Sequence, residues 1–196
     1  MGSTPAALTG SRPDVRFWAN LVGYQLVWFA IVISAARGQP MWGIAAAMAF
    51  IVVQFHFSGC RAADARALLA AFICGFLLDG ALSASGWLVY ASPLISLPAP
   101  AWILALWLAF AMTLNHSMAF LRGRPVLAGL LGGIGGPMAY LGAARGFDAV
   151  VFTPPAWHAI VLLAVGWSIA LATLAVLSQR WSIGAVGAAL RTEHVK

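Results

Sequence analysis

The sequence predicts an all-α protein, a polytopic transmembrane helix bundle with six spans and both termini in the cytoplasm. The chain of 196 residues is 62% apolar and 8% charged, whereas soluble domains contain about 25% charged residues. Residues 101–121 carry no charge and have the length of about 20 residues that one helical crossing requires. Most of the basic residues fall on the cytoplasmic side of such a bundle.

Three spans are predicted in the N-terminal half, at residues 17–36, 41–57 and 67–82, after a disordered cytoplasmic tail at residues 1–16. The first span is longer than the core of a signal peptide and others follow it, so we expect it to be retained. Asn20, Tyr24 and Trp28 recur in it every four residues, which gives the helix one polar and aromatic face.

The second and third spans also carry polar residues. Gln54 and His56 lie at the end of the second span, before a connection charged by Arg61, Asp64 and Arg66. In the third span, residues at four-residue intervals share one stripe. These residues are Ala71, Gly75, Asp79 and Ser83.

The next segment, residues 83–100, is uncharged but interrupted by one glycine and three prolines. These breaks make it too irregular for a span. An interfacial helix or a re-entrant loop is expected, capped by Trp87 and Tyr90, because such aromatic residues favour the membrane–water interface.

The C-terminal half is predicted to hold spans at residues 101–121, 126–144 and 156–177, separated by a loop at residues 145–155. The transmembrane domain would then cover residues 17–178, and residues 179–196 would form a cytoplasmic tail or a short surface helix. Small residues in the fifth span predict close helix packing, with a kink at a proline. These residues are Gly129, Gly132, Gly133, Gly136 and Pro137.

The basic residues test the number of spans. With six spans and a cytoplasmic N-terminus, nine basic residues fall inside and two outside, which matches the positive-inside rule. The inside residues are Arg12, Arg16, Arg61, Arg66, Arg122, Arg124, Arg180, Arg191 and Lys196, and the outside residues are Arg37 and Arg145.

Asp79 is the only acid within a predicted span. Insertion of an Asp at the centre of a membrane helix costs about 2.5–3.5 kcal/mol, so something must compensate for it. Asp79 is either a proton, cation or headgroup site, or a structural residue hydrogen-bonded to Tyr140 or paired with Arg145.

A second polar group is expected on the cytoplasmic side, where Asn115 and His116 interrupt the fourth span. They predict a headgroup site, a proton relay or a haem site shared with His56, or else hydrogen bonds that fix helix packing. The polar intramembrane candidates for binding are therefore Asp79, Asn115, His116, Asn20, Gln54, His56 and Tyr140.

Metal and cofactor chemistry is not predicted. His56 and Cys60 are four residues apart, but no second pair completes a metal site, and both Cys60 and Cys74 are expected to be reduced thiols. Phosphate-binding loops, HExxH and G-x-S-x-G motifs are absent from the sequence. We therefore expect no catalytic residue, no metal and no cofactor.

Four segments together resemble a known family: WANLVGYQLVWF at 18–29, GFLLDG at 75–80, PAWILALWLAFAMTLNHS at 100–117 and GGPMAYLGAARG at 135–146. The combination resembles a family of small proteobacterial inner-membrane proteins catalogued as a domain of unknown function. The resemblance implies a bacterial inner membrane and gene neighbours that resemble cyclopropane-fatty-acid synthases and flavin amine oxidases. It therefore implies a link to membrane lipid modification, and it assigns no residue a role.

The sequence thus favours an accessory or lipid-handling component of membrane lipid modification. The alternatives are a small proton-coupled transporter using Asp79 and a lipid-modifying enzyme using His116 as acid or base. Membrane lipids are the expected partners, together with a membrane protein or a second copy of the chain. Nucleic acid is not expected, because the basic residues are scattered singly.

Overall fold

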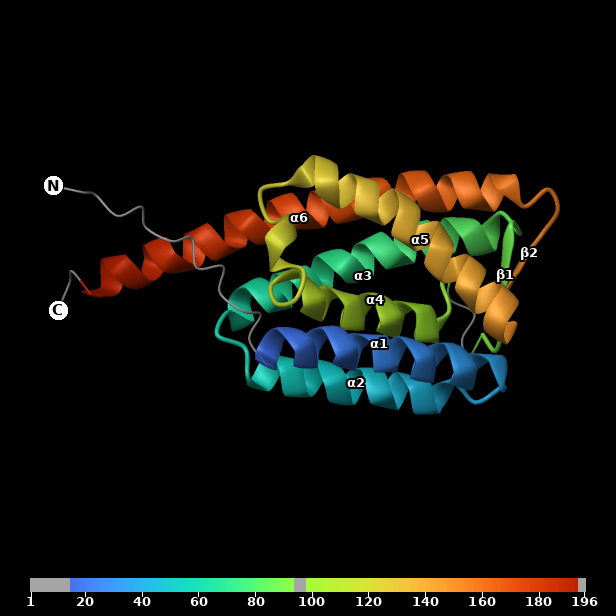
Figure 1. Cartoon of the computed structure of the whole chain (residues 1–196), viewed down its shortest axis with the longest axis horizontal. Coiled ribbons are helices and arrows are strands. Elements are labelled where there is room, and N and C mark those ends of the chain that lie inside the picture. Colours follow the sequence, from blue (N-terminus) through green and yellow to red (C-terminus); the bar gives the residue numbers. More distant parts are fainter. Residues whose placement is uncertain (1–14, 94–97, 194–196) are drawn as a thin grey trace, which may run out of the picture.

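The computed structural model describes residues 15–93 and 98–193, with side chains described up to residue 182. Over these residues the chain forms six α-helices whose successive members run in opposite directions (Figure 1). The helices are α1 (Val15–Ala36), α2 (Pro40–His56), α3 (Arg61–Ala84), α4 (Ala101–Leu114), α5 (Pro125–Phe147) and α6 (Trp157–Glu193). A 3-10 helix, η1 (Ala119–Leu121), and two strands, β1 (Leu88–Tyr90) and β2 (Val150–Phe152), complete the described elements.

Four of these helices, α1, α3, α5 and the part of α6 up to Ser182, are long and apolar enough to cross a membrane. Their outer faces expose large apolar side chains that water would solvate poorly. Examples are Leu26, Leu77, Ile134 and Ile169, each at least 60% exposed. These helices indicate a multi-pass membrane protein.

The central helix is α4, which contacts α1, α2, α3 and α6. Eleven of its 14 residues are buried. At about 21 Å it is shorter than a hydrocarbon core of about 30 Å, but protein surrounds it and the bilayer does not set its length. The predicted fourth span is therefore helical only from Ala101 to Leu114, and turns and η1 follow.

Small residues let α3 approach α4 closely. Ala71, Gly75 and Asp79 form a buried stripe on α3, as their spacing predicts. A Cβ atom at Gly75 would lie 2.4 Å from the Trp107 ring, so only glycine fits this contact.

The glycine-rich helix α5 begins against α6 and leans across the bundle towards the C-terminal end of α1 (Figure 1). There Phe147 meets Trp28 and Phe29, with ring centroids 6.1 and 6.0 Å apart. Pro137 lies within α5, and the helix continues on both sides of it.

A two-stranded ribbon stands where the sequence predicts an interfacial helix or re-entrant loop. Strand β1 pairs antiparallel with β2, with Val89 opposite Val151. The prediction for residues 83–100 is wrong over the described part, and the predicted loop at 145–155 contains β2. Valine, tyrosine and phenylalanine favour strands when they pack on a half-buried surface, and here the ribbon covers one end of the bundle.

The opposite end also differs from the prediction. Arg61, Asp64 and Arg66 belong to the first turns of α3 rather than to a connection. The segment predicted as a tail or surface helix continues α6 to Glu193. The predicted N-terminal tail lies outside the described residues up to residue 14, as do residues 194–196.

Candidate functional site

Asp79 is fully buried on α3, and its carboxylate accepts three hydrogen bonds from neutral donors. The Tyr90 hydroxyl donates to Oδ1 over 2.7 Å, and the Trp107 indole N–H donates to Oδ2 over 2.7 Å. The Tyr140 hydroxyl also donates to Oδ1. Asp79 therefore ties together α3, β1, α4 and α5 without an ion pair in the described part of the chain.

Tyr90 reaches this carboxylate from the ribbon, outside the helical spans. Burial, followed by the charge of Asp79, raises the pKa of Tyr90 far above its usual value. The hydroxyl consequently stays protonated and keeps donating to Asp79.

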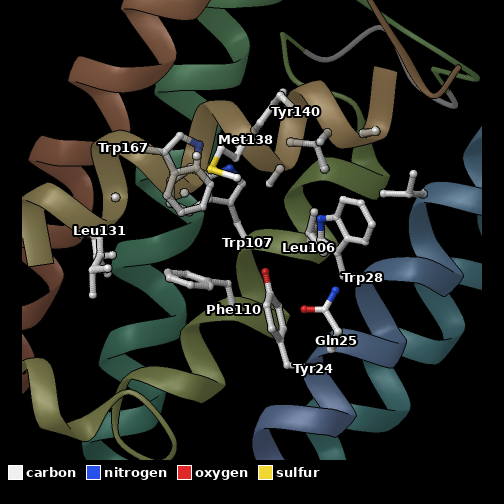
Figure 2. A pocket seen from close by; sticks show the side chains of 18 of the residues that line it. Tyr24, Gln25, Trp28, Leu106, Trp107, Phe110, Leu131, Met138, Tyr140 and Trp167 are labelled. Atoms are coloured by element: carbon white, nitrogen blue, oxygen red, sulfur yellow. The ribbon is translucent and has the colours of Figure 1, made fainter. Parts of the chain in front are cut away.

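A cavity of about 520 Å³ lies between α1, α4, α5 and α6 (Figure 2). Trp107 and Tyr140, which donate hydrogen bonds to Asp79, also line this cavity. Its volume falls within the range of about 300–1,000 Å³ typical of small-molecule sites. Most of its wall is apolar. The aromatic members of that wall are Tyr24, Trp28, Trp102, Trp107, Phe110, Tyr140 and Trp167.

The cavity wall is anchored at the stacked indoles of Trp107 and Trp167, whose centroids are 4.0 Å apart. The Trp167 ring nitrogen is buried and has no hydrogen-bond acceptor among the described residues. Figure 2 shows the Tyr24 hydroxyl directed towards the same space, near Phe110. An apolar pocket with a few polar groups is the usual composition of a ligand site.

The cavity can be reached from the outer surface of the bundle. Leu131 and Met138 line it, and they are 41% and 65% exposed. Both lie on the span α5, so this opening would face acyl chains rather than water.

A second polar cluster surrounds Asp64, in the first turn of α3 at the opposite end. Its fully buried carboxylate accepts hydrogen bonds from Ser58 and, over 2.8 Å, from the Asn115 side-chain amide. His116 Nε2 lies 3.2 Å from Asp64 Oδ2, and Cys60 Sγ lies 3.8 Å from Oδ1. Asn115 is held in turn by the Ser178 hydroxyl from α6.

Asn20 forms a third polar contact at the same end. Its side-chain amide donates to Gln54 Oε1 over 3.1 Å and to the Met112 carbonyl over 3.0 Å. Its oxygen accepts from the Ser117 hydroxyl over 2.6 Å. A smaller cavity of about 380 Å³, lined by residues that include Arg16, Gln54 and His116, adjoins both polar groups.

A family model for "Protein of unknown function (DUF2878)" matches residues 17–173. The chain belongs to the DUF2878 family. No curated protein and no solved structure shows significant similarity to it. The DUF2878 match covers the Asp79 cluster, the large cavity and the Asp64 cluster except for Ser178.

The structure divides the polar residues predicted from sequence into three groups. Asp79 contacts Tyr140, as one alternative expected, and does not pair with Arg145. Asn115 and His116 meet at Asp64, whereas Asn20 and Gln54 bond to each other. The His56 ring forms no hydrogen bond to any of these three groups and packs edge-on against Phe57, with ring centroids 5.0 Å apart.

Sequence reasoning missed Asp64, Tyr90 and Trp107. Asp64 was interpreted as a charge in a connection, although its four-residue spacing from Cys60 places both on one side of a helix start. A buried indole N–H or phenol needs a hydrogen-bond acceptor, and Asp79 is the only acid within a predicted span. These two facts could have predicted that Trp107 and Tyr90 donate to Asp79.

Proposed function

We propose that this protein handles membrane lipid by holding an acyl chain, or a similarly apolar molecule, in the aromatic cavity between α1, α4, α5 and α6. The observation that carries this proposal is the cavity of about 520 Å³ with an apolar wall and a lining that includes exposed Leu131 and Met138. A ligand could enter sideways from the bilayer without crossing a polar surface. The family resemblance adds an accessory role in membrane lipid modification.

The proposal includes a topology. In it the chain crosses a bacterial inner membrane six times, and the end of the bundle where α1 and α3 begin faces the cytoplasm. That end carries Arg16, Arg61, Arg122 and Arg124, as the positive-inside rule requires. The helix α4 would complete its crossing within the protein, because other helices surround it. The helix α2 would cross at the edge of the bundle, where only three of its 17 residues are buried.

Filling the cavity tests the proposal. Gly135 lines the cavity, and a Cβ atom there would meet nothing within 4 Å. Gly135→Leu should therefore fill the cavity while leaving the helix contacts intact. We expect the purified variant to retain at least tenfold less bound phospholipid than the unmodified protein, measured by native mass spectrometry after delipidation and reloading with phosphatidylethanolamine.

Gly146→Leu is the matched control. Gly146 also lies on α5 with free space around its Cα, but it does not line the cavity. The control should retain phospholipid as the unmodified protein does. Equal retention by Gly135→Leu and Gly146→Leu would contradict the proposal.

A proton-coupled transporter is the second candidate, and the burial of Asp79 directly behind the cavity wall favours it. In that case proteoliposomes with an imposed pH gradient should dissipate it faster than empty liposomes, as a trapped pH dye reports. Asp79→Asn should abolish the difference. Equal rates in protein-containing and empty liposomes would exclude this candidate.

A further inference from the structure

We propose that Cys60, Asp64 and His116 form a binding site for a divalent metal ion such as Zn²⁺. The side chains come from three different positions in the fold: the residue before α3, the first turn of α3 and the turn after α4. This proposal is independent of the lipid cavity, which lies towards the other end of the bundle.

The distances among the three side chains suit one ion. In a tetrahedral zinc site with bonds of about 2.0–2.3 Å, neighbouring ligand atoms stand about 3.3–3.8 Å apart. Here His116 Nε2 lies 3.2 Å from Asp64 Oδ2, and Cys60 Sγ lies 3.8 Å from the other carboxylate oxygen, Oδ1. With one ligand atom taken from each residue, all three atoms lie within 4.8 Å of one another, so no edge needs to close by more than about 1–1.5 Å.

The surroundings of Asp64 resemble the outer shell of a metal site. Metal-binding carboxylates are usually held by further hydrogen bonds that fix their orientation. Ser58 and Asn115 donate to the Asp64 carboxylate, and Ser178 fixes Asn115. Asp64 is fully buried, while the His116 side chain is 21% exposed, so the cluster is enclosed yet reachable.

The donor set indicates the class of ion. Thiolate, imidazole and carboxylate together select zinc and similar ions over Mg²⁺ or Ca²⁺, which prefer oxygen ligands. Three protein ligands leave a fourth position for water or another ligand. His116 also lines the cavity of about 380 Å³, which gives such a ligand access from one side.

Metal titration of the purified full-length protein tests the site. After removal of metal with a chelator, equilibrium dialysis against Zn²⁺ and elemental analysis should give one tightly bound ion per chain. Cys60→Ser and His116→Ala should weaken binding at least tenfold, and Asn115→Ala should weaken it about 10–100-fold because it loosens Asp64. Co²⁺ loading should give a thiolate charge-transfer band that Cys60→Ser removes.

Two controls separate this site from other interpretations. Cys74→Ser removes the second thiol, which lies outside the cluster, and His56→Ala removes the histidine that spacing alone would pair with Cys60. Both should bind Zn²⁺ as the unmodified protein does. Binding of less than one tenth of an ion per chain by the folded unmodified protein would overturn the proposal. Equal binding by the unmodified protein and Cys60→Ser, with no cobalt–thiolate band, would also overturn it.

Discussion

At the scale of single residues, two buried acids on α3 are stabilised in different ways. Asp64 and Asp79 are both fully buried and lie about 22 Å apart along the helix. Asp79 is surrounded by a phenol, a second phenol and an indole, whereas Asp64 is near an imidazole and a thiol. The first arrangement suits a fixed structural anchor, and the second suits binding.

Asp79→Asn tests the anchor. An asparagine places an N–H group where one carboxylate oxygen accepted a hydrogen bond, so a buried donor loses its acceptor. We expect the free energy of unfolding to fall by about 1–3 kcal/mol, measured by denaturation in detergent micelles. Asp148→Asn is the control, because Asp148 is exposed and has a left-handed backbone conformation that asparagine also tolerates.

An Asp79→Asn protein as stable as Asp148→Asn would show that the three hydrogen bonds to the Asp79 carboxylate do not contribute to the free energy of unfolding. The interpretation of Asp79 as a tie between α3, α4, α5 and the ribbon would then fail.

Sequence alone predicted part of this residue chemistry. It identified Asp79 with Tyr140 as one alternative, because a membrane span leaves a buried acid few partners. It did not join His116 to Asp64, since the contact spans 52 residues of sequence and Asp64 lies near two arginines that suggest solvent. Residue spacing predicts which side chains share a face of one helix, but it does not predict which residues of different helices meet.

At the scale of elements, glycine spacing determines how closely α5 approaches α6. A Cβ atom at Gly132 would lie 2.3 Å from the Trp167 backbone oxygen. Backbone cannot move aside as a flexible side chain can. The packing of these two helices therefore depends on a bare Cα at this position.

Gly132→Ala should lower the free energy of unfolding by about 1–3 kcal/mol, because the extra methyl group overpacks the contact. Gly135→Ala, one turn away with open space around it, should change stability by no more than about 0.5–1 kcal/mol. Denaturation of both variants in the same detergent checks this. A Gly132→Ala protein at least as stable as Gly135→Ala would contradict the close contact.

The elements themselves were predictable to different degrees. Long apolar stretches indicated the helices correctly, because lipid requires each span to satisfy its own backbone. The β1–β2 ribbon was not predicted, since each strand has three residues and its partner lies about sixty residues away in sequence. Likewise, α4 ends before its apolar stretch does, because surrounding protein rather than bilayer thickness sets its length.

At the scale of the whole molecule, the arrangement of basic residues predicts the orientation. Fluorescent-protein fusions after Gly59 and Gly123 should fluoresce, because both sites lie at the arginine-rich end. Alkaline phosphatase fusions after Gly38 and Asp148 should be active, because these sites lie at the opposite end. Phosphatase activity after Gly123 would contradict six spans with a cytoplasmic N-terminus.

The central claim at this scale is that the cavity admits an acyl chain through its opening at Leu131 and Met138 of α5. Photolabelling with a phospholipid that carries a photoactivatable acyl chain tests it most directly. We predict that label on the lining segments 24–32 and 131–143 is displaced by excess unlabelled phospholipid, whereas label on the outer face of α6, at Val161 and Val165, is weaker and is not displaced selectively. Uniform labelling of all exposed apolar faces, with no segment preferentially competed, would contradict the claim.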